Sequence, residues 1–313
     1  MSAVNVSEVF IGMPAYNGEK FIAKAIYSLI HQSFQNFRLV IADDQSTDGT
    51  REIAEAFAAR DSRVEYQLNP ERLGGARNFS QLARMADTPY FMWAAQDDMW
   101  HPEYIEKCLA HLQERPQASV CVTNLFFTDA EDTKTGGLDN MATEGQDIRT
   151  AIQTFISYGM WYALYGLMRT EVLQQTHLYT NRYGGDVLLQ LELLLQGEIA
   201  KVPEMMFAYR KGDEFKTPQQ NMYAIDHTIA DVPRKYYTEL FQDLFGIVMH
   251  SSLSPELKQA VYRDFLEALQ DSGKTWRERI WEENCADFAA AVLNQRDIAA
   301  AANAPDFMNP FSR

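Results

Sequence analysis

The chain has 313 residues and a formal net charge of −15 at pH 7, with 46% hydrophobic and 23% charged residues. These values are typical of a globular protein with one large domain and a smaller appendage, and they exclude a disordered chain. The negative charge argues against general nucleic-acid binding, which needs a basic surface to neutralise phosphates. Any phosphate-binding site must therefore be local.

The cysteines and the N-terminal residues favour a cytoplasmic protein. Cys108, Cys121 and Cys285 are an odd number without paired spacing, each in an apolar run, so we expect reduced and buried thiols. The first eight residues lack a basic stretch followed by an apolar one, which a secretory signal has. No apolar stretch reaches the roughly 18 residues that span a membrane. We expect a protein that is at most peripheral at the inner face of the membrane.

Strands and helices alternate between residues 9 and 127. Short apolar runs alternate with apolar residues at helical spacing, a pattern that predicts parallel βαβ units with right-handed crossovers. Ligands of such sheets bind at the carboxyl ends of the strands. The predicted strands are residues 9–13, 37–42, 64–68, 90–95 and 119–127, and the helices between them cover residues 21–30, 53–58, 79–83 and 104–112.

The pattern changes after the fifth predicted strand. The polar, acidic stretch 129–147 predicts a mobile loop near the ligand site. Helix and strand signals resume at Thr150, whereas the residues beyond Thr217 carry helix patterns alone. We therefore expect an α/β domain over residues 1–216 and a helical C-terminal extension over residues 217–313.

Polar and acidic residues follow three of the predicted strands. The segment 14–17 follows the first strand, an Asp-Asp pair at 43–44 follows the second, and Gln-Asp-Asp at 96–98 follows the fourth. We expect these segments to converge at one edge of the sheet. A fixed carboxylate suits the imide N–H of a pyrimidine base, and hard oxygen ligands suit the Mg²⁺ or Mn²⁺ that accompanies a diphosphate. The pattern predicts a site for a nucleotide and a divalent cation.

Three segments, residues 9–30, 39–50 and 96–102, resemble the family 2 glycosyltransferases, whose fold is called GT-A. Weaker matches lie at Gly184-Gly185-Asp186 and at Tyr209-Arg210. The resemblance implies a doubly wound, mostly parallel sheet with helices on both faces. It also implies an inverting enzyme of polysaccharide biosynthesis, which moves a sugar from a UDP- or dTDP-sugar to a hydroxyl of a glycan or lipid-linked acceptor.

The resemblance implies a role for individual residues. Asp44 contacts the base, and Asp186 is the catalytic base that faces the acceptor hydroxyl. Adjacent strand residues point to opposite faces, so Asp97 and Asp98 divide their roles. Asp98 meets the Mn²⁺ or Mg²⁺, while Asp97 approaches the ribose or phosphate. The remaining nucleotide-binding positions are Pro14, Ala15, Tyr16, Asn17 and Arg72.

The chain departs from the family pattern at two places. Ala95-Gln96 stands where many relatives carry a further Asp, and Lys211-Gly212 stands where many carry a His. Both departures leave the metal with fewer ligands from the protein. One or two carboxylates nevertheless suffice for Mg²⁺ or Mn²⁺ when the donor phosphates complete the coordination.

Several candidate residues also have a structural interpretation. Asp43 suits a hydrogen bond at the end of the sheet, Asp186 suits a helix N-cap, and Arg72 suits a solvated side chain. Trp161, with its neighbours Tyr162 and Tyr165, suits either an acceptor-sugar platform or core packing. A basic and aromatic stretch suits either peripheral membrane contact or helix packing. It comprises Lys274, Trp276, Arg277, Arg279, Ile280 and Trp281.

Other functions are disfavoured by particular residues. A sugar-phosphate nucleotidyltransferase has a Gly-rich, Arg-containing loop after its first strand, whereas residues 13–17 read Met-Pro-Ala-Tyr-Asn. A phosphatase with an aspartyl nucleophile has an acid two residues further on, whereas Gln45 and Ser46 follow Asp44. A catalytically inactive nucleotide-binding or assembly module is the remaining alternative, which the two departures from the family pattern favour.

Overall fold

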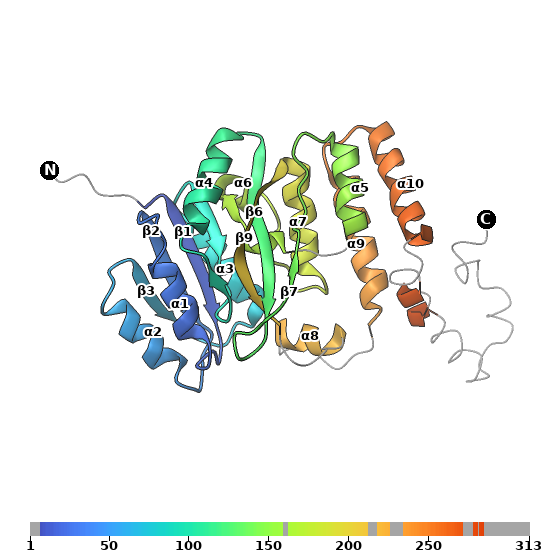
Figure 1. Ribbon diagram of the computed structural model, residues 1–313. Coiled ribbons are helices and arrows are strands. Elements are labelled where there is room, and N and C mark those ends of the chain that lie inside the picture. Colours follow the sequence, from blue (N-terminus) through green and yellow to red (C-terminus); the bar gives the residue numbers. More distant parts are fainter. Residues whose placement is uncertain are drawn as a thin grey trace, which may run out of the picture. The chain divides into compact units, whose positions relative to one another are not determined.

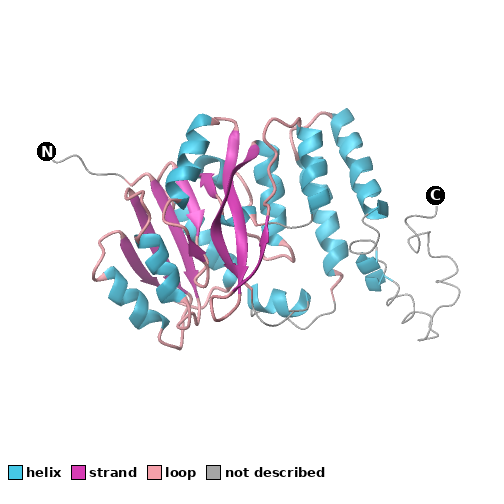
Figure 2. Cartoon of the chain, in the orientation of Figure 1, coloured by secondary structure: helices cyan, strands magenta, loops and turns pink. Residues whose placement is uncertain are grey.

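The computed structural model describes residues 7–158, 162–211, 218–225, 234–271, 278–280 and 282–284. The chain divides into two compact units, Met1–Ile229 and Ala230–Arg313. The first unit contains the sheet, and the described part of the second is helical (Figures 1 and 2). The helix α8 (Pro218–Ile225) contacts α3 and lies in the first unit, so this division falls later in the chain than residue 216.

The first unit opens with the expected alternation of strands and helices. Its first elements are β1 (Val9–Ala15), α1 (Ile22–Ile30), β2 (Phe37–Asp43), α2 (Thr50–Ala58), β3 (Val64–Leu68), α3 (Gly75–Met85), β4 (Tyr90–Trp93), β5 (Met99–Trp100) and α4 (Tyr104–Glu114). They are followed by β6 (Ala118–Thr128), β7 (Lys134–Leu138), α5 (Ile148–Tyr158), the short 3₁₀ helix η1 (Ala163–Tyr165), β8 (Leu167–Arg169), α6 (Thr170–Gln174), α7 (Gly185–Gln196) and β9 (Glu198–Arg210).

The strands form one sheet in the order β3-β2-β1-β4-β8-β6-β9-β5, with β7 on the side of β6. The first four strands are parallel, which confirms the predicted βαβ units. The other half is mixed, because β8 runs antiparallel to both β4 and β6 while β6 and β9 are parallel. The α/β class and the GT-A-like architecture are thus confirmed, and the parallel pairing is continuous only in the first half.

The predicted mobile loop over residues 129–147 is wrong in part. It contains β7, which pairs antiparallel with β6 and has a register shift beside Thr128. The sequence does not predict this strand, because most of its residues are exposed and two of them are glycines, Gly136 and Gly137. It therefore lacks the alternation of apolar and polar residues that indicates a strand.

Two faces of β1 serve two layers of the core. Val9, Ile11 and Met13 belong to the cluster that also contains apolar residues of α1 and α4. Side chains alternate along a strand, so Phe10 and Gly12 face the other layer. There Phe10 stacks on Phe91 at 5.8 Å between ring centroids. The sheet is therefore buried on both faces, and Cys108 and Cys121 are buried free thiols as predicted, while Cys285 lies outside the described residues.

The second unit contains α9 (Tyr236–His250) and α10 (Pro255–Asp271). These helices meet through aromatic contacts, including Phe241 with Phe265 at 5.8 Å between ring centroids. Of the basic and aromatic stretch, Arg279 and Ile280 are described. Ile280 is buried, and the Arg279 guanidinium lies 5.6 Å from the centre of the Tyr237 ring, as the packing interpretation expects. Lys274, Trp276, Arg277 and Trp281 lie outside the described residues.

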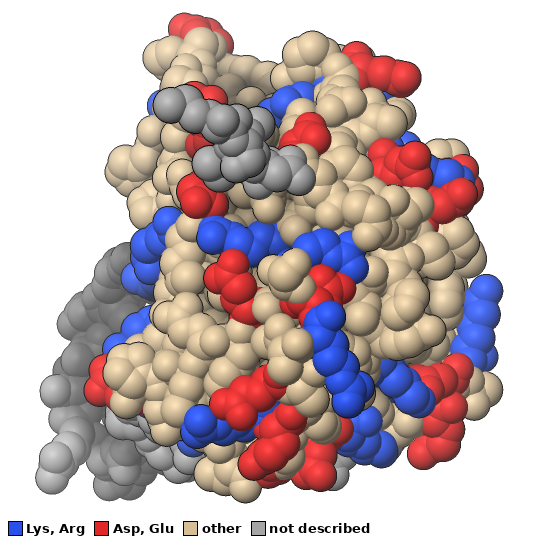
Figure 3. All heavy atoms as spheres, turned by 90° about the vertical axis from the view of Figure 1, so that its left-hand side faces the viewer, with Lys and Arg blue, Asp and Glu red and all other residues tan. Residues whose placement is uncertain are grey.

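The surface and the helices bear on the kind of environment that the protein meets. On the face shown in Figure 3, basic and acidic side chains are interspersed, so this face does not form a continuous basic surface. Among the described residues, none of the helices combines the length and apolar character that crossing a membrane would require.

Gly12 tests how tightly α3 packs on the sheet. A Cβ at this position would lie 2.9 Å from Leu82 Cβ and 3.2 Å from the Phe91 ring. Gly12→Ala should lower the free energy of unfolding by about 1–3 kcal/mol, because neither neighbour is the free end of a flexible chain. Gly246→Ala is the matched control: nothing lies within 4 Å of its Cβ position in α9, so it should stabilise by about 0.5–1 kcal/mol. Denaturant unfolding measures both, and equal effects would contradict the close packing.

Candidate active site

The three polar segments converge because β2, β1 and β4 are neighbours in the sheet. The side chain of Gln96, in the turn after β4, holds the peptide groups of Tyr16 after β1. Gln96 Oε1 accepts a hydrogen bond from the Tyr16 N–H at 2.9 Å, and Gln96 Nε2 donates to the Tyr16 carbonyl at 3.0 Å. Gly18 N–H donates to Thr50 Oγ1 at 2.7 Å, which joins the same turn to the start of α2. The expected meeting at one sheet edge is therefore observed.

The predicted nucleotide-binding segment 14–17 is only partly accessible. Pro14 and Ala15 are buried in β1, whereas Tyr16 is half-buried and Asn17 is exposed. Asn17 has a left-handed backbone, with φ of 48°, and its Oδ1 accepts from the Thr47 N–H at 2.8 Å. The side-chain amide of Asn17 thus stabilises the turn. Tyr16 is the residue of this segment whose aromatic ring is available for contact with a ligand.

Asp44 holds the loop between β3 and α3. Its Oδ1 accepts from the Leu73 N–H at 2.6 Å and from Asn69 Nδ2 at 3.0 Å, while its Oδ2 accepts from the Gly74 N–H at 2.8 Å. These bonds fix the loop that carries Arg72, whose guanidinium lies 4.1 Å from the centre of the Tyr16 ring. The structure thus brings Asp44, Arg72 and Tyr16 into one assembly.

Asp43 follows the structural interpretation. Its Oδ1 accepts from the Ser46 N–H and its Oδ2 accepts from the Tyr66 hydroxyl, both at 2.8 Å. Burial of Tyr66 and this hydrogen bond raise the pKa of the phenol. Both oxygens of the fully buried Asp43 are therefore engaged in closing the end of β2.

Asp98 is a buried carboxylate, and one of its two oxygens has no hydrogen-bond donor among the described residues. Its Oδ1 accepts from the Arg210 N–H at 2.8 Å, whereas no donor among the described residues reaches its Oδ2. Burial raises the pKa of Asp98 well above its usual range, and the neighbouring Asp97 raises it further. Such an oxygen is costly unless a cation or a donor meets it.

The Asp98 oxygen fits a divalent cation. A carboxylate that is buried, short of donors and next to a second acid is satisfied by Mg²⁺ or Mn²⁺, which prefer oxygen ligands. Among the described residues, no group of three or more His, Cys, Asp or Glu side chains forms a closed metal site. Asp98, with Asp97 beside it, therefore suits a cation whose other ligands come from a bound diphosphate.

Arg210, at the end of β9, ties three segments together around the acids. Its Nε donates to the Asp97 carbonyl at 2.9 Å, its Nη1 donates to the Asp129 carbonyl, and its Nη2 pairs with Asp132. The guanidinium also lies 4.2 Å from the centre of the Phe21 ring. The weak Tyr209-Arg210 match in the sequence marked this position, but nothing in the sequence indicated these partners.

Asp186 lies in the first turn of α7, two residues after the helix N-cap. The N-cap itself is Gly184, with a left-handed φ of 70°, so the N-cap interpretation of Asp186 is wrong. Burial raises the pKa of Asp186, although backbone hydrogen bonds from Val187 and from its own N–H act in the opposite direction. A carboxylate with a raised pKa is a stronger base than an ordinary one, which suits proton abstraction.

Tyrosines connect Asp98 with Asp186. Burial raises the pKa of Tyr162, and Asp98 and Asp186 both raise it further, so this phenol is close enough to interact with both acids. Tyr209 also interacts with both, and its ring meets that of Tyr162 edge-on at 5.0 Å between centroids. Trp161, the predicted acceptor platform, lies outside the described residues. Its described neighbour Tyr162 and the more distant Tyr209 are aromatic residues that interact with both acids.

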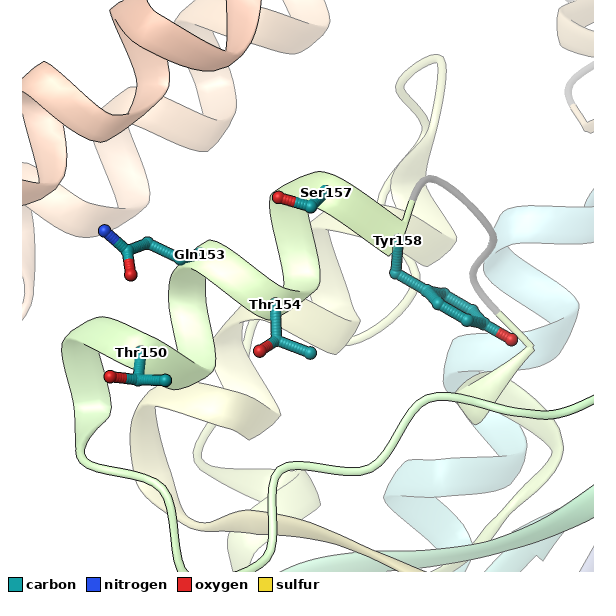
Figure 4. A pocket seen from close by; sticks show the side chains of 5 residues that line it. All are labelled: Thr150, Gln153, Thr154, Ser157 and Tyr158. Atoms are coloured by element: carbon teal, nitrogen blue, oxygen red, sulfur yellow. The ribbon is translucent and has the colours of Figure 1, made fainter.

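A separate pocket lies on α5 (Figure 4). Its lining consists of residues of this helix alone, and it contains neither an acid nor any predicted site residue. Tyr158, at its end, donates a hydrogen bond to the Asp139 carbonyl at 2.5 Å. The lining residues are Thr150, Gln153, Thr154, Ser157 and Tyr158.

Comparison with known proteins finds similar glycosyltransferases. The Streptococcus pneumoniae glycosyltransferase GlyG is 25% identical over 218 residues, which make up 65% of this chain and 70% of GlyG. Several other curated relatives are matched over less than half of their length.

Two solved structures share the fold at low identity. Residues 1–349 of S. aureus TarS in complex with UDP-GlcNAc have a TM-score of 0.64 and 15% identity, over 88% of this chain and 79% of that fragment. The Pyrobaculum calidifontis mannosyltransferase PcManGT, in complex with GDP-Man and Mn²⁺, has a TM-score of 0.53 and 13% identity, over 95% of this chain and 77% of PcManGT.

A family match completes the comparison. Residues 10–174, which are more than half of the 313 residues, match the family described as glycosyl transferase family 2. This chain therefore belongs to glycosyl transferase family 2 and is a glycosyltransferase.

Proposed function

We propose that the enzyme transfers a sugar, with inversion, from a UDP- or dTDP-sugar to a hydroxyl of a glycan or lipid-linked acceptor in polysaccharide biosynthesis. The observation that carries this proposal is the arrangement of acids. Asp98 has a buried oxygen without a donor among the described residues, in the turn whose Gln96 contacts Tyr16. Asp98 and Asp186 both interact with Tyr162 and Tyr209. The UDP-GlcNAc complex of TarS supports a uridine donor, and the Mn²⁺ complex of PcManGT supports a metal.

Asp186 is the general base in this proposal. The acceptor oxygen forms a bond to the anomeric carbon while the bond from that carbon to the diphosphate oxygen breaks. The acceptor proton passes to the Asp186 carboxylate. Inversion requires a proton acceptor on the side opposite the leaving group, and a carboxylate with a raised pKa suits that role.

Asp98 would hold Mn²⁺ or Mg²⁺ through its open Oδ2, with Asp97 toward the ribose or phosphate. A bound cation supplies charge stabilisation to the leaving diphosphate. Arg210 keeps Asp98 in position, since its backbone N–H donates to Oδ1 and its side chain donates to the Asp97 carbonyl.

Asp44 and Arg72 would bind the base together with Tyr16. Three donors already bind the Asp44 carboxylate, which has about four acceptor positions, so one remains for the imide N–H of uracil or thymine. Adenine offers no N–H at the equivalent ring position. Trp161 would serve as a platform for the acceptor sugar. For a lipid-linked acceptor, the enzyme would contact the cytoplasmic face of the membrane from its periphery.

An inactive nucleotide-binding module is the alternative that experiment must separate from an enzyme. The match to glycosyl transferase family 2 and the curated glycosyltransferase relatives favour the enzyme. Release of nucleoside diphosphate from a panel of UDP- and dTDP-sugars with simple acceptors decides between them. A module would bind a donor without turnover.

Asp98→Ala should reduce transfer by roughly a thousandfold or more, because charge stabilisation by a metal is worth several kcal/mol. A chelator should abolish wild-type activity, and added Mn²⁺ should restore it. Asp87→Asn is the control, since Asp87 is an exposed acid just before β4 that pairs with Arg38 near the start of β2, whereas the site lies at the other ends of these strands. Steady-state rates with and without Mn²⁺ measure the effect, and a wild-type rate in Asp98→Ala would refute the assignment.

Asp186→Asn should lower kcat by roughly 10²–10⁴-fold while donor affinity is unchanged. Only the deprotonated carboxylate accepts a proton, so wild-type kcat should fall as the pH drops through a pKa above the ordinary 3.8. Because the folded-state pKa is raised, the ionised carboxylate costs stability above that pKa, and the cost disappears as the pH falls. The Asn variant should therefore be at least as stable as wild type at neutral pH. Near-normal turnover in this variant would exclude Asp186 as the base.

Asp44→Asn should weaken uridine and thymidine diphosphate binding by about tenfold, because an amide has one acceptor oxygen, which the N–H groups of Leu73 and Gly74 would occupy, and none would remain for the imide N–H of the base. Adenosine diphosphate should bind weakly to the wild type and should be affected little by the substitution. Calorimetric titration with the three nucleotides measures the difference. Equal loss for all three would show that Asp44 holds the loop without selecting the base.

A further inference from the structure

We propose that Gln96 is a positioning residue that fixes Tyr16, and through it Arg72, for nucleotide binding. The inference rests on the proposed function, in which Tyr16 and Arg72 meet the base. Gln96 makes both hydrogen bonds of its amide to one residue, the N–H and the carbonyl of Tyr16, at 2.9 and 3.0 Å. This pairing spans 80 positions of sequence and sets the orientation of the Tyr16 backbone.

The chemistry of the pairing requires a carboxamide. Gln offers one acceptor and two donors, whereas an ionised Asp or Glu only accepts. A carboxylate at position 96 would place negative charge against the Tyr16 carbonyl and would leave that carbonyl without its donor. The absence of a further acid at Ala95-Gln96 therefore has a structural consequence. In this chain, two hydrogen bonds between Gln96 and Tyr16 join the turn after β4 to the turn after β1, and we call this pair of bonds the latch.

Gly18 makes room for the latch. A Cβ on Gly18 would lie 2.3 Å from Gln96 Oε1 and 2.5 Å from Gln96 Cδ. The three atoms nearest to that position all belong to Gln96, and Gly18 is not among the glycines with a positive φ. A methyl group at Gly18 would therefore displace the end of the Gln96 side chain, while the backbone of Gly18 does not have a positive φ.

The latch acts on the nucleotide site through Tyr16. The Arg72 guanidinium lies 4.1 Å from the centre of the Tyr16 ring, and its loop is anchored to Asp44 through Leu73 and Gly74. If the Tyr16 backbone changes its orientation, the Tyr16 ring moves away from its position under the Arg72 guanidinium. Asp97 follows Gln96 directly in the chain, so the latch also joins the base-binding loops to the acid turn.

The test uses the full-length enzyme and the variants Gln96→Glu, Gln96→Ala, Gly18→Ala and the double variant Gln96→Ala with Gly18→Ala. The probe is UDP with Mn²⁺, titrated by calorimetry. Gln96→Glu should weaken UDP binding by about tenfold, since it loses a donor and gains a repelling charge. In transfer assays the donor KM should rise by about as much, while kcat stays within about twofold, because Asp186 is untouched.

The double variant separates the latch from ordinary destabilisation. Gly18→Ala should weaken UDP binding about as much as Gln96→Ala, because its Cβ displaces the Gln96 side chain. Gln96→Ala removes the three atoms nearest to the added methyl group, so the double variant should bind UDP like Gln96→Ala alone. Additive losses would overturn the inference.

Gln174→Glu is the matched control. Gln174 Nε2 also donates to backbone carbonyls, those of Ala83 and Ala86, and this variant should leave UDP affinity unchanged. Wild-type affinity in Gln96→Glu, or an equal loss in Gln174→Glu, would refute the role of Gln96 while leaving the proposed function intact. If the wild type binds none of UDP, dTDP and GDP, the proposed function and this inference both fail.

Discussion

Taking a carboxylate out of water costs several kcal/mol unless hydrogen bonds or a cation compensate it, and this constraint shapes the whole carboxyl edge of the sheet. Asp43, Asp44 and Asp98 are all buried there. Both oxygens of Asp43 and of Asp44 find donors from the adjoining loops, so these two acids hold the edge together. Asp98 finds a donor for one oxygen alone among the described residues, so its Oδ2 still needs a cation or a donor.

The site combines loops that are held in place by hydrogen bonds with carboxylates whose burial costs free energy. The turn after β1 is held by Gln96 on one side and by Thr50 on the other, and the loop before α3 is held by Asp44. Such fixed surroundings keep side chains oriented for a ligand before it arrives, which limits the entropy lost on binding. Burial raises the pKa of Asp98 and of Asp186, so ionisation of these two carboxylates opposes folding.

Arg210 explains how distant parts of the chain reach the same site. Its side chain is almost fully buried, yet it bonds to the acid turn, to the turn between β6 and β7, and to Asp132, which also pairs with Lys24 of α1. The pKa of Asp132 is lowered by Lys24 first and by Arg210 second. The mixed half of the sheet thus supports the acids that follow the parallel half.

Local patterns in the sequence were sufficient for part of this description. Alternating apolar runs and helical stripes identified the strands β1 to β4 with their helices, and chain order placed acids after the second and fourth predicted strands. These features depend on residues close together in the chain, where side-chain periodicity is a direct record of burial.

Tertiary structure decided what each of these residues does. The donor to Asp98 comes from Arg210, 112 positions away, and the partner of Gln96 lies 80 positions away. No local pattern encodes such pairings, so the sequence could not tell that Asp44 is bound by a loop or that Gln96 joins two loops. The exposed strand β7 escaped for a related reason, since its pairing with β6 rests on backbone hydrogen bonds that leave no mark in side-chain hydrophobicity.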